Sequence, residues 1–249
     1  MELAGKVALV TGGSGDLGSA ISRALARGKM DVAVTYVGEK GRADQVVSEV
    51  KDAGCRAWAV QLDQSTIDQP DKVVAATVEH FGRLDVLVNN AAWNIGIPFS
   101  DLEALTPEIF DRMYATNLRG PYLLARAAAR TMTEQGEGRI VNVASIGGLY
   151  PSSSSIAYSS MKAGLIHLTR CLAVALAPSV LVNCVAPGLI EGTRMAGRLP
   201  DAVREGAIQR AVLHRAATVD DIAEQVVTFC RTDSINGQVM PIDAGSVFN

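Results

Sequence analysis

The sequence of 249 residues predicts a single-domain α/β fold, in which a seven-stranded, doubly wound parallel sheet carries helices on both faces. Three observations predict this fold class. Seven short apolar runs alternate with helical patterns, the runs are apolar on both of their faces, and a glycine-rich turn follows the first of them. Strands that are apolar on both faces are typical of a parallel sheet that helices cover on both sides.

The expected strands are rich in β-branched and aliphatic residues, and longer segments with helical patterns separate them. Thr106 and Pro107 mark one helix start, because these residue types are favoured at an N-cap and in a first helical turn. The alternation predicts right-handed crossovers and leaves too little chain for a separate substrate domain. In chain order, the expected strands span 6–11, 31–37, 56–62, 84–90, 139–145, 180–186 and 238–243, and the expected helices span 17–28, 40–53, 67–81, 106–114, 118–135, 155–177 and 218–231.

Composition narrows the classes of partner and location. Charged residues make up 20% of the chain, the formal net charge is -3 and no basic block occurs, so neither nucleic acid nor an anionic membrane is expected as a partner. The four cysteines lie far apart and the three histidines lack ligand spacing, which argues against a disulfide framework and a metal site. No signal peptide or membrane-spanning run is evident, so we expect a cytoplasmic protein.

A glycine-rich turn, TGGSGDLG at 11–18, lies between the first expected strand and the first expected helix. Glycines in this place let the backbone approach a pyrophosphate, whose charge the helix N-terminus stabilises. An ordinary tight turn is the alternative interpretation. The placement favours dinucleotide binding by a Rossmann fold, with contacts from Gly12, Ser14, Gly15, Asp16, Leu17 and Gly18.

A second motif, AYSSMKAG at 157–164, places Tyr158 and Lys162 four residues apart and hence on one helix face. The helix is apolar nearly all round, so we expect it to be buried, and a buried lysine requires a reason. A nearby ammonium lowers the pKa of a phenol from its ordinary value of about 10 toward a useful acid or base. A chance surface pair is the alternative.

Ser145 lies at the end of an expected strand, thirteen residues before Tyr158, and Asn117 begins a long expected helix. With these motifs the chain resembles the short-chain dehydrogenase/reductase family in its compact form, near its 3-oxoacyl reductase-like carbonyl reductases, over essentially its whole length. The resemblance implies that Tyr158 is the acid or base, and that Lys162 lowers its pKa and holds the nicotinamide ribose. It also implies that Ser145 hydrogen-bonds the substrate oxygen, that Asn117 holds a water, and that the nicotinamide carries the hydride.

The chain departs from the family's turn, TGxxxGxG, at one position. Asp16 stands where the family has its middle glycine, and Gly15 lies one place earlier. A carboxylate near a pyrophosphate repels it, unless the side chain turns away to cap the helix N-terminus. We expect the capping role, with Gly15 supplying the flexibility of the turn.

The choice of nucleotide depends on the end of the second strand. Tyr36 stands where NAD-preferring relatives carry an aspartate, and the arginines of many NADP-preferring relatives, at Gly15 and Val37, are absent as well. NADP(H) is favoured over NAD(H), because the acidic partner of the ribose hydroxyls is missing. The residues expected to meet a 2′-phosphate are Thr35, Lys40 and Arg42.

Later turns supply the remaining expected contacts. The polar segment 189–212 is expected to be a mobile substrate lid that carries an amphipathic helix. The resemblance assigns further cofactor contacts to Asp63, Asn90, Ala91, Pro187, Gly188, Ile190 and Thr193, and the positions after the strands predict a substrate pocket lined by Trp93, Ile146, Tyr150, Leu189 and Met195.

These observations predict an NAD(P)(H)-dependent oxidoreductase that interconverts a ketone and a secondary alcohol on a small molecule. A 3-oxoacyl-(acyl-carrier-protein) reductase is the alternative, but the loop 133–138 is acidic and 177–179 has no basic residue, so an acidic carrier protein meets little attraction. A non-catalytic nucleotide-binding relative is a third possibility. The resemblance also implies a homotetramer, or a homodimer, assembled through the two long helices.

Overall fold

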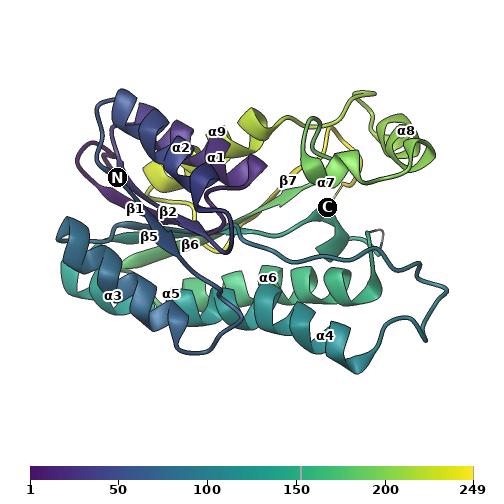
Figure 1. The fold of residues 1–249 in the computed structure, drawn as a ribbon, viewed down its shortest axis with the longest axis horizontal. Coiled ribbons are helices and arrows are strands. Elements are labelled where there is room, and N and C mark those ends of the chain that lie inside the picture. The colour runs from purple at the N-terminus through teal and green to yellow at the C-terminus, as the bar shows by residue number, and fades with distance from the viewer. Residues whose placement is uncertain (152, 249) are drawn as a thin grey trace.

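The computed structural model describes residues 1–151 and 153–248. Its centre is a seven-stranded sheet with the strand order β3-β2-β1-β4-β5-β6-β7, and all neighbouring strands run parallel (Figure 1). The chain builds outward from β1 to β3 and then returns to build outward from β4 to β7. The predicted doubly wound fold is therefore confirmed, and its switch point lies between β1 and β4.

Each strand lies within its expected range or extends one residue beyond it. Apolar and β-branched residues dominate the strands, as a sheet buried on both faces requires. The strands are β1 (Val7–Val10), β2 (Asp31–Tyr36), β3 (Ala57–Gln61), β4 (Val86–Asn89), β5 (Gly138–Val143), β6 (Val180–Pro187) and β7 (Val239–Ile242).

The helices form a layer on each side of the sheet (Figure 1). One layer contains α1 (Asp16–Arg27), α2 (Lys40–Asp52) and α9 (Val219–Arg231), and the other contains α3 (Gln69–Phe81), α5 (Gly120–Gln135) and α6 (Ile156–Ala175). The shorter elements are α4 (Pro107–Tyr114), a π-helical turn (Ala115–Arg119), a 3-10 turn (Ile146–Gly148), α7 (Arg194–Gly197) and α8 (Asp201–Arg210).

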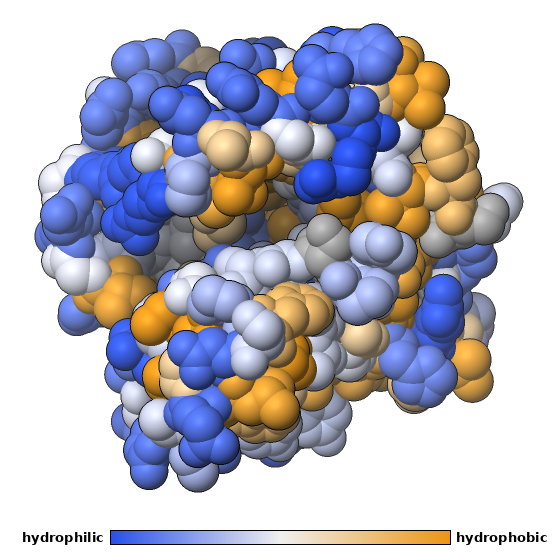
Figure 2. Space-filling model, turned by 90° about the vertical axis from the view of Figure 1, so that its right-hand side faces the viewer, coloured by the Kyte–Doolittle hydropathy of each residue, from blue (hydrophilic) through white to orange (hydrophobic). Residues whose placement is uncertain are grey.

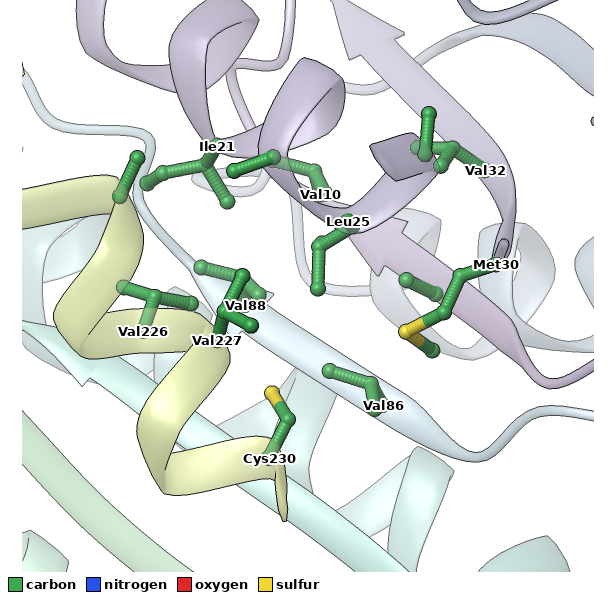
Figure 3. Close-up of a cluster of buried hydrophobic side chains, with 14 of the residues drawn as sticks. Val10, Ile21, Leu25, Met30, Val32, Val86, Val88, Val226, Val227 and Cys230 are labelled. Atoms are coloured by element: carbon green, nitrogen blue, oxygen red, sulfur yellow. The ribbon is translucent and has the colours of Figure 1, made fainter. Parts of the chain in front are cut away.

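Two hydrophobic cores lie on opposite faces of the sheet, because successive side chains of a strand point to opposite sides. In β1, Ala8 and Val10 belong to the core beneath α1 and α9, whereas Val7 and Leu9 belong to the core beneath α3 and α5. Figure 3 shows the first core, where Ile21 and Leu25 of α1 and Val226, Val227 and Cys230 of α9 lie over strand side chains such as Val10 and Val88. This double burial fixes the sheet as a rigid platform for the loops at its edge.

Local start signals place the helices that carry candidate site residues. The Thr106 hydroxyl accepts a hydrogen bond from the backbone N–H of Ile109, so the expected start of α4 is confirmed. The Ser155 hydroxyl caps α6 in the same way, with the backbone N–H of Tyr158 as donor at 3.2 Å. This cap fixes Tyr158 in the first turn of its helix.

The segment 189–212 contains two helices, α7 and α8. The prediction of a helix here is confirmed, but its expected amphipathic character is wrong, since no residue of α8 is buried. Its charged and small residues give no apolar stripe for packing. Among the described residues, no helix has the length and apolarity needed to span a bilayer.

Candidate active site

The candidate site lies at the carboxyl ends of the strands, where the loops after β1, β4, β5 and β6 come together. This edge is on the right of Figure 1, and the space-filling view of that side shows a central hollow (Figure 2). In open α/β sheets ligands bind outside the carboxyl ends of the strands, next to the switch point. The architecture therefore places both sequence motifs at one opening.

Ser145 and Tyr158 lie close together at this edge of the sheet. Ser145 directly follows β5 and caps the 3-10 turn, its hydroxyl accepting a hydrogen bond from the backbone N–H of Gly147 at 3.1 Å. Tyr158 is 8% exposed, and its side chain lies beside that of Ser145. Burial raises the pKa of Tyr158 to about 12, and the neighbouring Ser145 hydroxyl acts in the opposite direction.

Lys162 lies one turn further along α6 and is only 2% exposed. Its ammonium group donates a hydrogen bond to the backbone carbonyl oxygen of Val143 at 2.7 Å, and Nζ lies 5.5 Å from the centre of the Tyr158 ring. Burial lowers the pKa of Lys162 to about 8, while the nearby Cys184 acts to raise it. Tyr158 and Lys162 thus share a buried helix face, as their spacing predicted.

The net lowering of the Tyr158 pKa that the sequence led us to expect is not observed, because burial raises this pKa instead. Both groups are buried, and the loss of water around the phenolate outweighs other influences on Tyr158. The ammonium of Lys162 is also engaged by the Val143 carbonyl rather than by the phenol oxygen. The phenol is consequently neutral at ordinary pH, which is the form of a proton donor.

Asn117 lies in the π-helical turn between α4 and α5 rather than at a simple helix start. Its side-chain amide makes two hydrogen bonds with the backbone of Trp93. Oδ1 accepts from the N–H of Trp93 at 3.0 Å, and Nδ2 donates to the carbonyl oxygen of Trp93 at 2.8 Å. The amide therefore fixes the loop after β4 beside α6. Its role in holding a water stays a prediction.

The glycine-rich turn has the shape that a dinucleotide requires. Gly12 has a positive φ of 60°, and its backbone N–H donates to the hydroxyl of Thr35 at 2.9 Å. A Cβ at Gly18 would lie 2.2 Å from the carbonyl oxygen of Gly12, so only glycine fits there. Together with the following N-terminus of α1, the turn has a shape that suits a diphosphate. Residues 11–18 are called the phosphate turn below.

The loop after β4 is locked to the phosphate turn. The Thr11 hydroxyl oxygen accepts hydrogen bonds from the backbone N–H groups of Asn90 and Ala91, both at 2.9 Å. The Asn90 side chain donates to the carbonyl oxygen of Thr11 at 2.8 Å. Asn90 and Ala91 therefore lie beside the glycine-rich turn and brace it from the neighbouring strand, and their contact with a cofactor stays a prediction.

The prediction that Asp16 caps α1 is wrong. The N-cap is Gly15, and no side chain caps this helix. The carboxylate of Asp16 instead accepts hydrogen bonds from the backbone N–H of Arg194 at 2.8 Å and from the guanidinium of Arg42 at 3.1 Å. Burial acts to raise the pKa of Asp16, but the hydrogen bonds and charge of Arg194, with the bond from Arg42, leave it below its ordinary value.

The side chains expected near the adenosine of the cofactor differ in their exposure and in the partners that they already bind. Thr35 is buried and its hydroxyl serves Gly12, so the expectation that it meets a 2′-phosphate is wrong. Lys40 is exposed and pairs with Asp44 at 2.6 Å. Tyr36 ends β2 and is half-buried. On the other side of β2, Asp63 follows β3 and accepts hydrogen bonds from the backbone and the hydroxyl of Ser65.

The turn after β6 closes the site from the far side. The N–H of Gly188, which follows Pro187, donates to the carbonyl of Ile242 at 3.0 Å, and a Cβ at Gly188 would lie 2.7 Å from the Cβ of Asp243. Ile190 forms an isolated bridge with Ala217. Thr193 caps α7 and donates its hydroxyl to the carbonyl of Ile190. The Thr193 side chain thus serves the local turn in this structure.

A cavity of about 160 Å³ lies beneath α8. Of the predicted substrate residues, it is lined by Ile146, Tyr150 and Leu189; Trp93 lies outside it and packs near Tyr158 instead. Met195 is 52% exposed and is not part of the lining. Part of the remaining lining comes from α8, which lies within the predicted lid segment. The other residues, from the turn before α9 and from the chain after β7, carry no local sequence signal. The remaining lining consists of Ala207, Ile208, Arg210, Arg215, Ala216, Asp243, Ser246 and Val247.

Known proteins resemble this chain over nearly its whole length. Residues 6–204 match the family model described as short chain dehydrogenase. An oxidoreductase of uncharacterized activity from Methylorubrum extorquens is 38% identical, and a 3-oxoacyl-[acyl-carrier-protein] reductase from Synechocystis sp. is 36% identical, each covering 98% of both chains. A short chain dehydrogenase from Burkholderia cenocepacia, solved in complex with NADP, is 35% identical with a TM-score of 0.91 and covers 99% of both chains.

The family match spans far more than half of the chain, and the strand order, the glycine turn and the pair formed by Tyr158 and Lys162 agree with it. A short sequence match that arose by chance would not explain these features, because they come from elements spread along the whole sequence. The chain belongs to the short-chain dehydrogenase family of oxidoreductases.

Proposed function

We propose that this oxidoreductase interconverts a ketone and a secondary alcohol on a small molecule, with Tyr158 as the acid or base. One observation carries the proposal: the buried Tyr158 side chain lies beside Ser145 at the strand edge, with the buried ammonium of Lys162 on the same helix face. A neutral phenol and a hydroxyl that lie side by side present two hydrogen-bond partners to one oxygen atom of a substrate.

In the direction of reduction, Ser145 and Tyr158 hydrogen-bond the carbonyl oxygen and polarise it. Tyr158 then donates its proton to that oxygen, and the ammonium of Lys162 stabilises the phenolate that forms. In the direction of oxidation, the same phenolate removes the proton of the alcohol. The nicotinamide, when bound, supplies or accepts the hydride.

The proposed cofactor is NADP(H) in preference to NAD(H). Two features of the chain support this choice: β2 ends in Tyr36 without a carboxylate for the ribose hydroxyls, and Arg42 holds its guanidinium at the start of the following helix. The Burkholderia relative was solved with NADP, which agrees with the same choice. Gly12, Gly18 and the N-terminus of α1 would hold the diphosphate.

We propose further that segment 189–212 acts as a substrate lid. Its helix α8 contributes Ala207, Ile208 and Arg210 to the cavity, and none of the residues of this helix is buried. A helix without buried residues opens at little free-energy cost, as a substrate gate requires. The cavity joins the lid to Ile146 and Tyr150, next to the proposed catalytic serine.

A 3-oxoacyl group on a carrier protein is the second candidate substrate, because the Synechocystis relative carries that activity in its name. The character of the loop before β5 argues against it. Glu137 belongs to this acidic loop at the amino-terminal edge of the sheet and pairs with Lys6 and Arg139, so the loop offers an acidic carrier little attraction. A free ketone is therefore the preferred substrate class.

The proposed assembly is a homotetramer built through α5 and α6. A shallow groove of about 300 Å³ runs across these helices, and the aromatic side chains of Tyr114 and Tyr122 stand 42% and 44% exposed at it. Exposed apolar and aromatic surface of this kind marks an interaction site. The groove is lined by Tyr114, Leu118, Arg119, Tyr122, Gly164, His167, Leu168 and Cys171.

The deciding experiment measures nucleotide binding and turnover in the same variants. We expect NADPH to bind more tightly than NADH in a fluorescence titration, and small ketones to be reduced. The Tyr158→Phe variant should lose turnover by about 10²- to 10⁴-fold, the usual contribution of a general acid, and keep the NADPH affinity of the wild type. Binding without turnover of any ketone or carrier-bound substrate would favour the non-catalytic alternative, and equal turnover in Tyr158→Phe would exclude the proposed role.

A further inference from the structure

Three elements of the structure meet at the carboxylate of Asp16. The residue opens α1 at the phosphate turn, and its partners come from α2 and from the segment after β6, 178 residues away. Oδ2 accepts from the backbone N–H of Arg194 at 2.8 Å, and the Nε of Arg194 lies 3.2 and 3.3 Å from the two oxygens. The Nη2 of Arg42 donates to Oδ1 at 3.1 Å.

The cluster around Asp16 carries an excess of positive charge, which favours the binding of an anion. One carboxylate meets two guanidinium groups, so the cluster formed by Asp16, Arg42 and Arg194 carries a net charge of +1. An unpaired carboxylate at the N-terminus of α1 would repel a diphosphate at close range, whereas a paired one within a positive cluster does not. The pairing therefore explains how the phosphate turn tolerates an acidic residue.

The pair with Arg194 also fixes a segment that has few other attachments to the phosphate turn. Ile190 and Glu191 are tied to Ala217 by a bridge and a backbone hydrogen bond. Gly192 follows with a positive φ of 72°, and the next side chain bound to another element is that of Arg194. Both the backbone and the side chain of Arg194 bind Asp16, so the contact sets the position of α7 as well as the charge.

We propose that Asp16 is the docking point that fastens segment 189–212 to the phosphate turn through Arg194, and that Arg194 in return cancels the repulsion between Asp16 and the diphosphate of the cofactor. Asp16 and Arg194 are thus positioning residues that link the cofactor site to the substrate side. The charge part of this proposal rests on the proposed cofactor; the docking part does not.

Four variants test both parts: Asp16→Asn, Arg194→Gln, the double variant, and Arg198→Gln as a control. Arg198 lies four residues further along the same segment, is exposed, and is not among the partners of Asp16. Two measurements are made: the Kd of NADPH and NADH by fluorescence titration, and backbone hydrogen exchange over 190–212 in the protein without nucleotide. Thermal melts of each variant establish that the fold is retained.

We expect Arg194→Gln to weaken the binding of both nucleotides by about tenfold, because it leaves the carboxylate of Asp16 short of one positive partner near the diphosphate. The double variant should regain most of that loss, since the repelling charge is gone as well. Hydrogen exchange over 190–212 should become faster in Asp16→Asn, in Arg194→Gln and in the double variant, and should stay unchanged in Arg198→Gln.

Two results would overturn the proposal. If the double variant binds nucleotide as weakly as Arg194→Gln, Arg194 does not act by cancelling the charge of Asp16. If exchange over 190–212 is unchanged in Asp16→Asn, the carboxylate does not dock the segment. A wild-type protein that binds neither nucleotide would contradict the proposed function instead, and the exchange measurement would still decide the docking.

Discussion

Two buried side chains decide the protonation chemistry of the candidate site. Burial raises the pKa of Tyr158 to about 12 and lowers the pKa of Lys162 to about 8. The same desolvation acts on both, because it disfavours whichever form of a group is charged. Lys162 is therefore the group of this pair whose charge changes nearest to neutral pH.

This assignment predicts the pH dependence of ketone reduction. The rate constant kcat should be constant at neutral pH and fall as the pH rises through about 8, because Lys162 loses the charge that stabilises the phenolate of Tyr158. A pH–rate profile with saturating nucleotide and ketone measures this. A rate that stays constant up to pH 10 would show that the charge of Lys162 is not needed in the rate-determining step.

The choice of nucleotide can be tested at Arg42. Replacing it by glutamine should weaken NADPH binding by about tenfold more than NADH binding, because only NADPH carries a phosphate on the ribose 2′ position, while the loss of one partner of Asp16 affects both nucleotides alike. Lys40→Gln is the matched control, since its ammonium is already paired with Asp44 at 2.6 Å. An equal loss for both nucleotides in Arg42→Gln would place this arginine at the diphosphate instead.

At the scale of secondary-structure elements, helix α1 combines a structural and a functional part. Its N-terminus continues from the phosphate turn, and its inner face packs against α9 and the sheet through buried residues such as Ile21 and Leu25 (Figure 3). The core packing fixes the position of α1, and α1 fixes the position of the glycine-rich turn that leads into it. Loss of packing at α1 should therefore reduce both stability and nucleotide affinity.

Leu25→Ala tests this link. Leu25 is fully buried, and its truncation should lower the free energy of unfolding by about 2–5 kcal/mol, the usual range for a core leucine. Urea denaturation followed by circular dichroism measures the change. Ile67→Ala is the control, since its side chain is 65% exposed and its truncation should change the stability by no more than about 0.5 kcal/mol. A similar loss in both variants would contradict the assignment of Leu25 to the core.

For the molecule as a whole, the sequence was sufficient to predict the sheet and the shared helix face of Tyr158 and Lys162, but not the long-range contacts. The strands were predictable because apolar runs such as VALV are buried on both faces, and Tyr158 and Lys162 because a helix places residues four apart on one face. The partner of Asp16 was not predictable, because a charged side chain pairs with any opposite charge that the fold brings near. The place of Val247 in the cavity was not predictable either, because it depends on which distant segments the fold brings together.

The proposed tetramer makes a prediction for the whole molecule. Tyr122→Asp should shift the protein to a smaller species in analytical ultracentrifugation, because it places a charge in the apolar groove across α5 and α6. Ile67→Asp is the control. Ile67 is exposed, lies two residues before α3 and is not part of this groove, so its substitution should leave the assembly unchanged. A wild-type protein that sediments as a monomer would exclude the assembly.

The amide of Asn117 has a consequence for how such a protein changes its substrate range. It holds Trp93 at one end of the loop after β4, and the cap at Thr106 holds the other end. Between these two fixed points most of the residues 94–105 are exposed or half-buried. Variation can therefore accumulate in this stretch while Ser145, Tyr158 and Lys162 stay in place, so the loop is a natural starting point for directed evolution toward new substrates.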